Sequence, residues 1–255
     1  MLILIKNLIF RSVGRDFSKY LGIKYAAFYL AAKFKLYESV EMSLLKKFVK
    51  TGDLVIDGGA NLGIYTHRLV DLVGESGRVV AFEPLGFLCE FIDRHVKSEC
   101  LQIEQKALSD SNQKMKIWIP YIGSGLLEPA LASLEQALSP SEQLIVETVK
   151  LDDHIKENEN VVYIKMDLEG YEMVALRGAE RVLQNNRPVV QFEENNMIGK
   201  LNDWQVYAAS IDYGLFKIDR KRRKSGTNFY LLPREQVNDL RENTLIGYTV
   251  MDISS

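Results

Sequence analysis

The hydrophobic positions along the chain change their period near residue 53. Before this point, apolar residues recur at helical spacing, for example over 25–33 and 40–48, which predicts two or three helices. From here to about residue 220, short apolar runs rich in β-branched residues alternate with helical segments. Strands are predicted at 54–56, 78–82, 101–104, 161–164 and 188–192, and helices at 65–73, 87–96, 172–183 and 204–211. This alternation is typical of an α/β fold, in which helices cover both faces of a parallel sheet.

Two segments depart from this alternation. The residues 115–119 and 144–151 predict a strand pair, joined by a long stretch from Pro120 to Pro140 that is of the length usually found in functional lids. Near the end, the runs 215–218 and 228–232 predict an antiparallel edge hairpin. We therefore expect a mainly parallel seven-stranded sheet with an antiparallel edge hairpin. The predicted domains are a helical N-terminal extension over 1–37 and one main domain over 38–255.

Composition and charge describe an ordinary globular protein. Of the 255 residues, 47% are hydrophobic and 26% charged, which excludes disordered and collagen-like classes. The net charge of −2 gives no general attraction to a polyanion, so no nucleic-acid partner is expected. The two cysteines, Cys89 and Cys100, have neither a disulfide-framework nor a zinc-site spacing. Free thiols suit a reducing compartment, and we expect a cytoplasmic protein.

The N-terminus begins with apolar residues, but Lys6, Arg11 and Arg15 interrupt them before any cleavage site. No stretch reaches the 18 or more apolar residues that a transmembrane helix needs. We favour a helix packed on its own domain or on a second subunit, which leaves a homodimer open. The basic and apolar spacing also leaves open a peripheral contact with a membrane surface.

A glycine-rich turn follows the first predicted strand. The run Asp57-Gly-Gly-Ala-Asn61 leads into a helix that begins near Gly63, where glycine permits left-handed backbone and the helix N-terminus offers free N–H groups. The second strand ends in Phe82-Glu83-Pro84, which places an acidic side chain where it can accept the hydroxyls of a ribose. Together the two strand ends predict a nucleoside cofactor.

The details of the turn favour one nucleoside over another. A dinucleotide fingerprint has glycine where this chain has Ala60, and the carboxylate of Asp57 would repel a pyrophosphate. The same carboxylate would attract an ammonium or sulfonium group. S-adenosylmethionine satisfies both ends, with its methionyl part near Asp57 and its ribose at Glu83.

Five runs of sequence resemble the FkbM-type S-adenosylmethionine-dependent methyltransferases over about residues 38–232. They are IDGGANLGIYT (56–66), AFEP (81–84), VKLDD (149–153), IKMDLEGYE (164–172) and LRGA (176–179). The resemblance implies a Rossmann-like methyltransferase fold and methylation of a hydroxyl on a small-molecule, sugar or glycan acceptor or a related natural product. The cofactor-binding residues expected on this basis are Asp57, Gly59, Ala60, Asn61, Gly63 and Thr66 for the methionyl part, Glu83 with Pro84 for the ribose, Ala107 and Ser109 for the adenine, and Asp167.

Methyl transfer to a hydroxyl needs a group that accepts the hydroxyl proton. The carboxylates at the ligand-binding edge of the predicted sheet are Asp167, Glu169 and Glu193, which we expect to be catalytic. Asp167 and Glu169 alternate along the chain, so they point to opposite sides unless the backbone turns at Gly170. His154 is a weaker candidate for the base. Glu193 and Glu194 with Asp167 could ligate Mg²⁺, but a solvated acidic loop explains them as well, and no metal is assigned.

Two other functions stay open. The basic run from Lys217 to Lys224 would suit a nucleic-acid methyltransferase, although the chain lacks an Asn-Pro-Pro-Tyr-like tetrad and no aromatic residue interrupts the run. The chain could also be a non-catalytic module that keeps the cofactor-binding fold. A solvated hairpin tip explains the basic run without either function.

Overall fold

The computed structural model describes residues 40–122, 126–135, 140–220, 227–239 and 248–254. The predicted helical extension over 1–37 lies outside these residues. So do residues 123–125 and 136–139 of the predicted lid, and residues 221–224 of the basic run. Within the described part of the chain, no helix is both long and apolar enough to cross a membrane.

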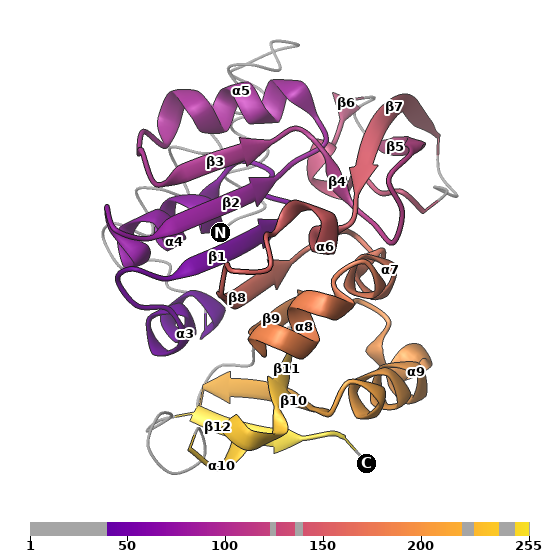
Figure 1. Cartoon of the computed structure of the whole chain (residues 1–255). Helices are drawn as coiled ribbons and strands as arrows, with labels where there is room; N and C mark the ends of the chain where they lie inside the picture. Colours follow the sequence, from indigo (N-terminus) through magenta and orange to yellow (C-terminus); the bar gives the residue numbers. More distant parts are fainter. Residues whose placement is uncertain (1–39, 123–125, 136–139, 221–226, 240–247, 255) are drawn as a thin grey trace.

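A central sheet runs through the molecule, from β3 at one edge to β12 at the other (Figure 1). Its strands, in the order β12-β10-β11-β9-β8-β1-β2-β3, are Tyr248–Asp252, Tyr213–Arg220, Asn228–Pro233, Val189–Glu193, Val161–Met166, Leu54–Gly58, Arg78–Phe82 and Leu101–Glu104. The five strands from β9 to β3 are parallel, whereas β10, β11 and β12 join by antiparallel pairing. The prediction of a mainly parallel sheet with an antiparallel hairpin is therefore confirmed.

The described sheet has eight strands, and the prediction of seven was wrong. The additional strand is β12, which pairs with the outer side of β10 from Phe216 to Arg220. The predicted hairpin β10–β11 consequently does not form the edge of the sheet. β12 was missed because its five residues, Tyr248–Asp252, are too short a run for periodicity to identify.

Helices cover both faces of the sheet. On one face lie α3 (Val40–Phe48) and α4 (Ile64–Val73), whose apolar side chains pack on those of alternate strand residues such as Val55 and Tyr163. On the other face lie α6 (Leu151–His154), α7 (Glu172–Arg177), α8 (Glu180–Asn186) and α9 (Met197–Ser210), which enclose the largest apolar cluster. The remaining helices are α5 (Gly86–His95), α10 (Val237–Asp239), η1 (Pro129–Leu131) and η2 (Arg234–Gln236). This three-layer arrangement buries both faces of the parallel strands.

The helix predicted over 172–183 is two helices, α7 and α8, with Gly178 and Ala179 between them. A Cβ atom at Gly178 would lie 1.9 Å from the carbonyl oxygen of Ser109, so the backbones meet at a distance only glycine permits. The carbonyl of Gly178 in turn accepts a hydrogen bond from the N–H of Asp152. The break in the helix is therefore set by contacts with segments that are distant in sequence.

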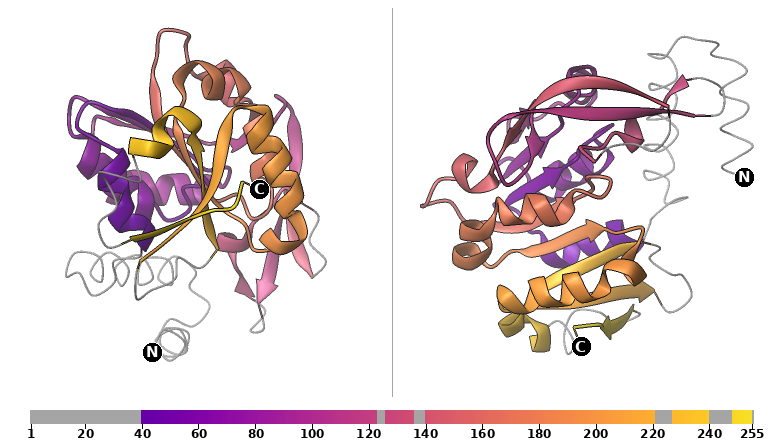
Figure 2. Two further views of the ribbon diagram at one scale, coloured as in Figure 1. Left: turned by 90° about the horizontal axis from the view of Figure 1, so that it is seen from below. Right: turned by 90° about the vertical axis from the view of Figure 1, so that its right-hand side faces the viewer.

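A second, smaller sheet has the order β4-β7-β5-β6. Its strands are Ala107–Leu108, Ser141–Val149, Lys114–Ile122 and Leu126–Leu127. The antiparallel pairing of β5 with β7 confirms the predicted strand pair. We call residues 114–149 the insert; it extends away from the central sheet as a long ribbon (Figure 2). Its base packs Ile117, Ile119 and Leu134 against Leu85 and Leu88 near the carboxyl end of β2.

Candidate active site

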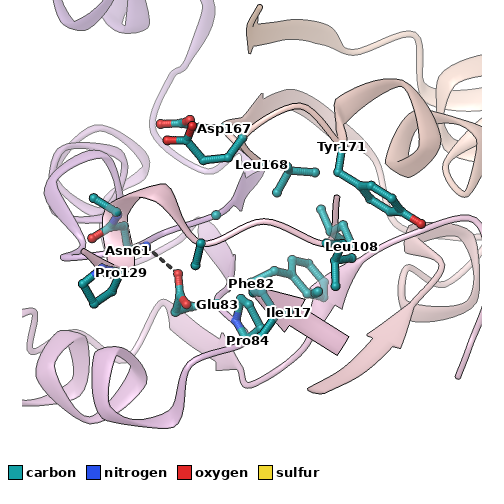
Figure 3. Close-up of a pocket in the computed structure, with 16 residues that line it drawn as sticks. Asn61, Phe82, Glu83, Pro84, Leu108, Ile117, Pro129, Asp167, Leu168 and Tyr171 are labelled. Atoms are coloured by element: carbon teal, nitrogen blue, oxygen red, sulfur yellow. Dashed lines mark hydrogen bonds between the residues drawn. The ribbon is translucent and has the colours of Figure 1, made fainter. Parts of the chain in front are cut away.

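A cleft that opens to solvent lies between the carboxyl ends of β1, β2 and β8 and the base of the insert (Figure 3). It is lined by Gly59, Asn61, Phe82, Glu83, Pro84, Ala107, Leu108, Ile117, Pro129, Ala130, Ala132, Leu134, Asp167, Leu168, Glu169 and Tyr171. Seven residues predicted from the sequence meet here: Gly59, Asn61, Glu83, Pro84, Ala107, Asp167 and Glu169. They come from distant parts of the chain, and parallel pairing brings the strand ends that carry most of them to one edge.

The glycine turn is fixed by backbone contacts with both neighbouring strands. The N–H groups of Gly59 and Ala60 donate to the carbonyl of Phe82, at 2.9 and 3.0 Å. Gly59 has a φ of 73°, and a Cβ atom there would lie 2.0 Å from the carbonyl oxygen of Asp167. The N–H of Asp167 donates to Gly58 at 3.1 Å. The turn and the segment after β8 are thus in direct backbone contact, which requires glycine at position 59.

Glu83 is buried at the mouth of the cleft, with 4% of its surface exposed. One carboxylate oxygen accepts the N–H of Asn61 at 2.8 Å, shown as a dashed line in Figure 3, and the other accepts the N–H of Leu85 at 2.9 Å. Burial raises the pKa of Glu83 to about 7, although both backbone bonds favour the ionised form. Each oxygen makes one bond here and can accept another, so the carboxylate can still receive hydroxyl donors from a ligand.

Asp57 lies beneath the turn and does not line the cleft. Its carboxylate accepts the Thr66 hydroxyl at 2.6 Å and lies 3.5 Å from the ammonium of Lys165, and none of its surface is exposed. The Lys165 ammonium also donates to the carbonyl of Gly59 at 3.1 Å and lies 3.6 Å from Asp167. Burial disfavours the charge on Lys165, but the two carboxylates outweigh it and raise its pKa. One buried cation therefore links the glycine turn to the carboxylates.

The segment from Asp167 to Gly170 forms a tight loop after β8. Glu169 and Gly170 have φ angles of 52° and 103°, so the chain turns there and both Asp167 and Glu169 line the cleft. Burial, reinforced by the charges of Asp167 and Glu193, raises the pKa of Glu169 to about 8. Beneath the loop, the buried Glu172 carboxylate accepts the N–H of Leu168 at 2.7 Å, and burial raises its pKa to about 7.

Glu193 lies at the same edge, one strand further along. Met166 of β8 pairs with Phe192 of β9, so the next residues, Asp167 and Glu193, are neighbours across the two strand ends. The Glu193 carboxylate accepts the hydroxyl of Thr227 at 2.6 Å, and burial raises its pKa. Glu193 is thus close to the cleft carboxylates, although it does not line the cleft itself.

The other residues predicted to bind the cofactor, or considered as a base, lie outside the cleft lining. Ala60 packs with Ala81 in a small apolar cluster, and Gly63 caps the start of α4. Ser109 is fully buried beside Gly178. His154 lies 3.7 Å from Glu104 and has its pKa lowered by burial. In the described part of the chain, no group of three or more His, Cys, Asp or Glu side chains is arranged to hold a metal ion.

Two features of the site were not found by reading the sequence. Lys165 lies inside an apolar strand run, and its only signal is its position two residues before Asp167. The insert contributes the apolar side chains of Ile117, Pro129 and Leu134 to the cleft lining. The sequence predicts a lid over Pro120 to Pro140, but nothing in it indicates that Pro129 and Leu134 line the same cleft as Glu83.

A family model described as the methyltransferase FkbM domain matches residues 57–219, well over half of the chain. No curated protein matches the chain. An FkbM methyltransferase from Methylobacillus flagellatus is similar in structure, with a TM-score of 0.48 and 16% identity over 90% of this chain, and this chain spans 58% of that protein.

Other solved methyltransferases are similar in structure as well. A SAM-dependent O-methyltransferase from Thermotoga maritima has a TM-score of 0.48 and 11% identity, and the match covers 79% of this chain and 68% of that protein. An rRNA methylase from Streptococcus thermophilus has a TM-score of 0.44 and 12% identity, and the match covers 75% of this chain and 91% of that protein. The family match covers the glycine turn, Glu83, and the loop from Asp167 to Gly170. The chain belongs to the FkbM methyltransferase family.

Proposed function

We propose that the chain is an S-adenosylmethionine-dependent O-methyltransferase that methylates a hydroxyl of a sugar, a glycan or a related natural product. The observation that carries this proposal is the composition of the cleft. A buried carboxyl, Glu83, stands at one end, and two carboxyls of the β8 loop, Asp167 and Glu169, stand at the other. The first suits a ribose and the others suit an acceptor hydroxyl. Membership of the FkbM family supports methyl transfer as the reaction.

The residues present fit the cofactor. Glu83 retains acceptor capacity for ribose hydroxyls, and the apolar side chains of Leu108, Ile117 and Leu134 offer a surface for an adenine ring. At the turn, the backbone of Gly59 and Asn61 borders the cleft on the side of Asp167, where a cationic methionyl group would be attracted. S-adenosylmethionine supplies a methyl group on a sulfonium centre. Holding the acceptor in line with it is where the protein gains most of its acceleration.

Glu169 is the residue we assign as the proton acceptor. With its pKa near 8, its carboxylate binds a proton more strongly than an ordinary glutamate, which suits a base working near neutral pH. Bound S-adenosylmethionine would supply the methyl group from its sulfonium and would leave as neutral S-adenosylhomocysteine. The carboxylate of Glu169 would take the proton that the acceptor hydroxyl loses. Asp167, which lines the cleft and is ion-paired with Lys165, would accept a hydrogen bond from another hydroxyl of the acceptor, and Glu193 lies next to it across the two strand ends.

The decisive experiment measures cofactor binding and transfer separately. Calorimetry with S-adenosylmethionine should show that Glu83→Gln raises the dissociation constant at least about tenfold, the effect of losing hydrogen bonds to a charged group. Exposed Glu75→Gln is the control and should bind normally. A panel of monosaccharides, oligosaccharides and lipid-linked sugars is then tested for release of S-adenosylhomocysteine.

The two readouts contradict different parts of the proposal. Unchanged binding by Glu83→Gln would overturn the ribose assignment. Tight cofactor binding without transfer to any hydroxyl acceptor would favour a non-catalytic module. Transfer to RNA with loss of activity at raised salt would favour a nucleic-acid methyltransferase instead.

A further inference from the structure

The conformation of the loop that carries Glu169 is unusual for the residues in it. Glu169 is not glycine, yet its φ of 52° lies in the left-handed region, and Gly170 follows at 103°. Residues other than glycine seldom adopt this backbone, and they do so where surrounding contacts hold them. The contacts that hold Glu169 therefore decide whether its carboxyl faces the cleft.

One of these contacts comes from the insert. The hydroxyl of Ser133 donates a hydrogen bond to the carbonyl oxygen of Glu169 at 2.9 Å and accepts one from the N–H of Glu135 at 3.0 Å. Both roles of the hydroxyl are thereby used, which fixes the direction in which it donates. The Glu135 carboxylate also approaches the loop, because a Cβ atom on Gly170 would lie 3.1 Å from its Oε2 atom.

Ser133 is itself held firmly. Its N–H and carbonyl form a pair of hydrogen bonds with the carbonyl and N–H of Trp118 on β5, at 3.0 and 2.9 Å. Its chain neighbours Ala132 and Leu134 both line the cleft. A single short segment of the insert thus lines the cleft and also bonds to the loop that carries Glu169.

We propose that Ser133 is a positioning residue for Glu169, which holds the Asp167–Gly170 loop in its left-handed turn and couples the insert to the acceptor side of the cleft. The role of Ser133 rests on the proposed function of Glu169 as the base. Glu172 supports the same loop from below, through the N–H groups of Leu168 and Gly170. The Ser133 contact links the loop to the segment 132–134, whose residues Ala132 and Leu134 line the cleft.

The test compares Ser133→Ala with a matched control in the full-length chain. Ser111 also donates one hydrogen bond, to Asp110, and accepts one, from Gln113, but does so in an exposed turn. Ser133→Thr keeps the hydroxyl and serves as the rescue variant. The main readout is the pKa of Glu169, measured by an NMR titration of protein labelled with ¹³C at the glutamate carboxyl carbons. The signal that is missing in Glu169→Gln identifies the Glu169 carboxyl.

Ser133→Ala should move the pKa of Glu169 from about 8 towards 4.5, because the released loop exposes the carboxyl to solvent and separates it from its neighbours Asp167, Glu172 and Glu193. Hydrogen exchange at the Leu168 and Gly170 amides should become roughly tenfold faster, the effect of losing one hydrogen bond. Ser133→Thr and Ser111→Ala should behave like the unchanged protein in both measurements.

An unchanged Glu169 pKa and unchanged exchange in Ser133→Ala would overturn the positioning role. The same change in Ser111→Ala would overturn it too, because the effect would then be general. Binding of S-adenosylmethionine, measured by calorimetry, separates this inference from the proposed function. If the unchanged protein fails to bind the cofactor, the proposed function fails, while the NMR titration still decides whether Ser133 holds the loop.

Discussion

The Glu83 carboxyl group at the mouth of the cleft should make cofactor binding depend on pH. Burial raises the pKa of Glu83 to about 7, and ribose hydroxyls donate more strongly to the ionised form than to the protonated form. As the pH falls below 7, more of the Glu83 carboxyl is protonated in the free protein. Binding must then remove this proton, which costs part of the binding free energy. The dissociation constant for S-adenosylmethionine should therefore rise by up to about tenfold for each pH unit below 7 and level off above about 8.

Calorimetry across this pH range checks the prediction, and Glu83→Gln is the control because it cannot ionise. The variant should bind more weakly at high pH and lose most of the pH dependence. A pH dependence that survives in Glu83→Gln would assign it to another group, and the raised pKa of Glu169 makes that carboxyl the first alternative.

Lys165 is the second residue whose replacement should have a measurable effect, in this case on the free energy of unfolding. Replacing it with methionine removes the cation that faces the buried Asp57 carboxylate. Leaving one partner of a buried ion pair alone typically costs about 3 to 5 kcal/mol in the free energy of unfolding. We expect Lys165→Met to be destabilised by this amount in urea denaturation. The double variant Asp57→Asn/Lys165→Met should recover much of the loss, and equal stability of the single and double variants would contradict the pairing.

The sequence predicted the residues at strand ends better than those inside strands. Glu83 and Asp167 follow apolar runs whose parallel pairing brings their ends to one edge, so their meeting could be foreseen. Asp57 was expected at the methionyl group because it precedes the glycines. In the structure its carboxylate points beneath the turn to Lys165, and a charged pair buried inside an apolar run leaves no periodic signal.

At the scale of elements, the break between α7 and α8 gives a prediction about Gly178. A methyl group at this position would collide with the Ser109 carbonyl, 1.9 Å away, and backbone cannot move aside as a side chain can. We expect Gly178→Ala to lower the free energy of unfolding by about 3 kcal/mol, the upper end for overpacking. Gly86→Ala is the control, because a methyl group there meets only the Gln105 side chain. Equal stability of the two variants would show that Gly178 is tolerant.

The same elements show what a sequence pattern captures. Strong apolar periodicity placed α4, β2 and β3 within a residue or two of their ends, since local sequence decides these elements. The helix 172–183 was not divided, because apolar spacing runs on through Gly178 while a contact with Ser109 sets the break. β12 was missed for a related reason, as its pairing with β10 stabilises a strand that is too short for its own pattern to identify.

For the whole molecule, buried carboxyls link folding to pH. Burial raises the pKa values of Glu83 and Glu172 to about 7 and that of Glu169 to about 8, against 4.5 when unfolded. The folded chain therefore binds more protons than the unfolded chain in this range, and its stability falls as the pH rises. We expect the free energy of unfolding to decrease from about pH 6.5 to about pH 8.

Urea denaturation at the two ends of this range measures the effect. The free energy of unfolding of Glu169→Gln should decrease less steeply with pH, because one of the three carboxyls is no longer present to ionise. S-adenosylmethionine should restore stability more strongly at the higher pH, where Glu83 is ionised and the ligand binds the folded state only. Stability that increases with pH over this interval would contradict the buried, protonated carboxyls.

The backbone contact between Gly59 and Asp167 has a consequence for protein engineering. The carbonyl of Asp167 occupies the space of a missing side chain at Gly59, and its N–H bonds to Gly58. The segments on either side of this contact cannot be exchanged independently between relatives, since a graft of one alone would leave a void or a collision. Chimeras intended to change acceptor preference should therefore transplant the glycine turn and the β8 loop as one block, and place their crossovers elsewhere in the chain.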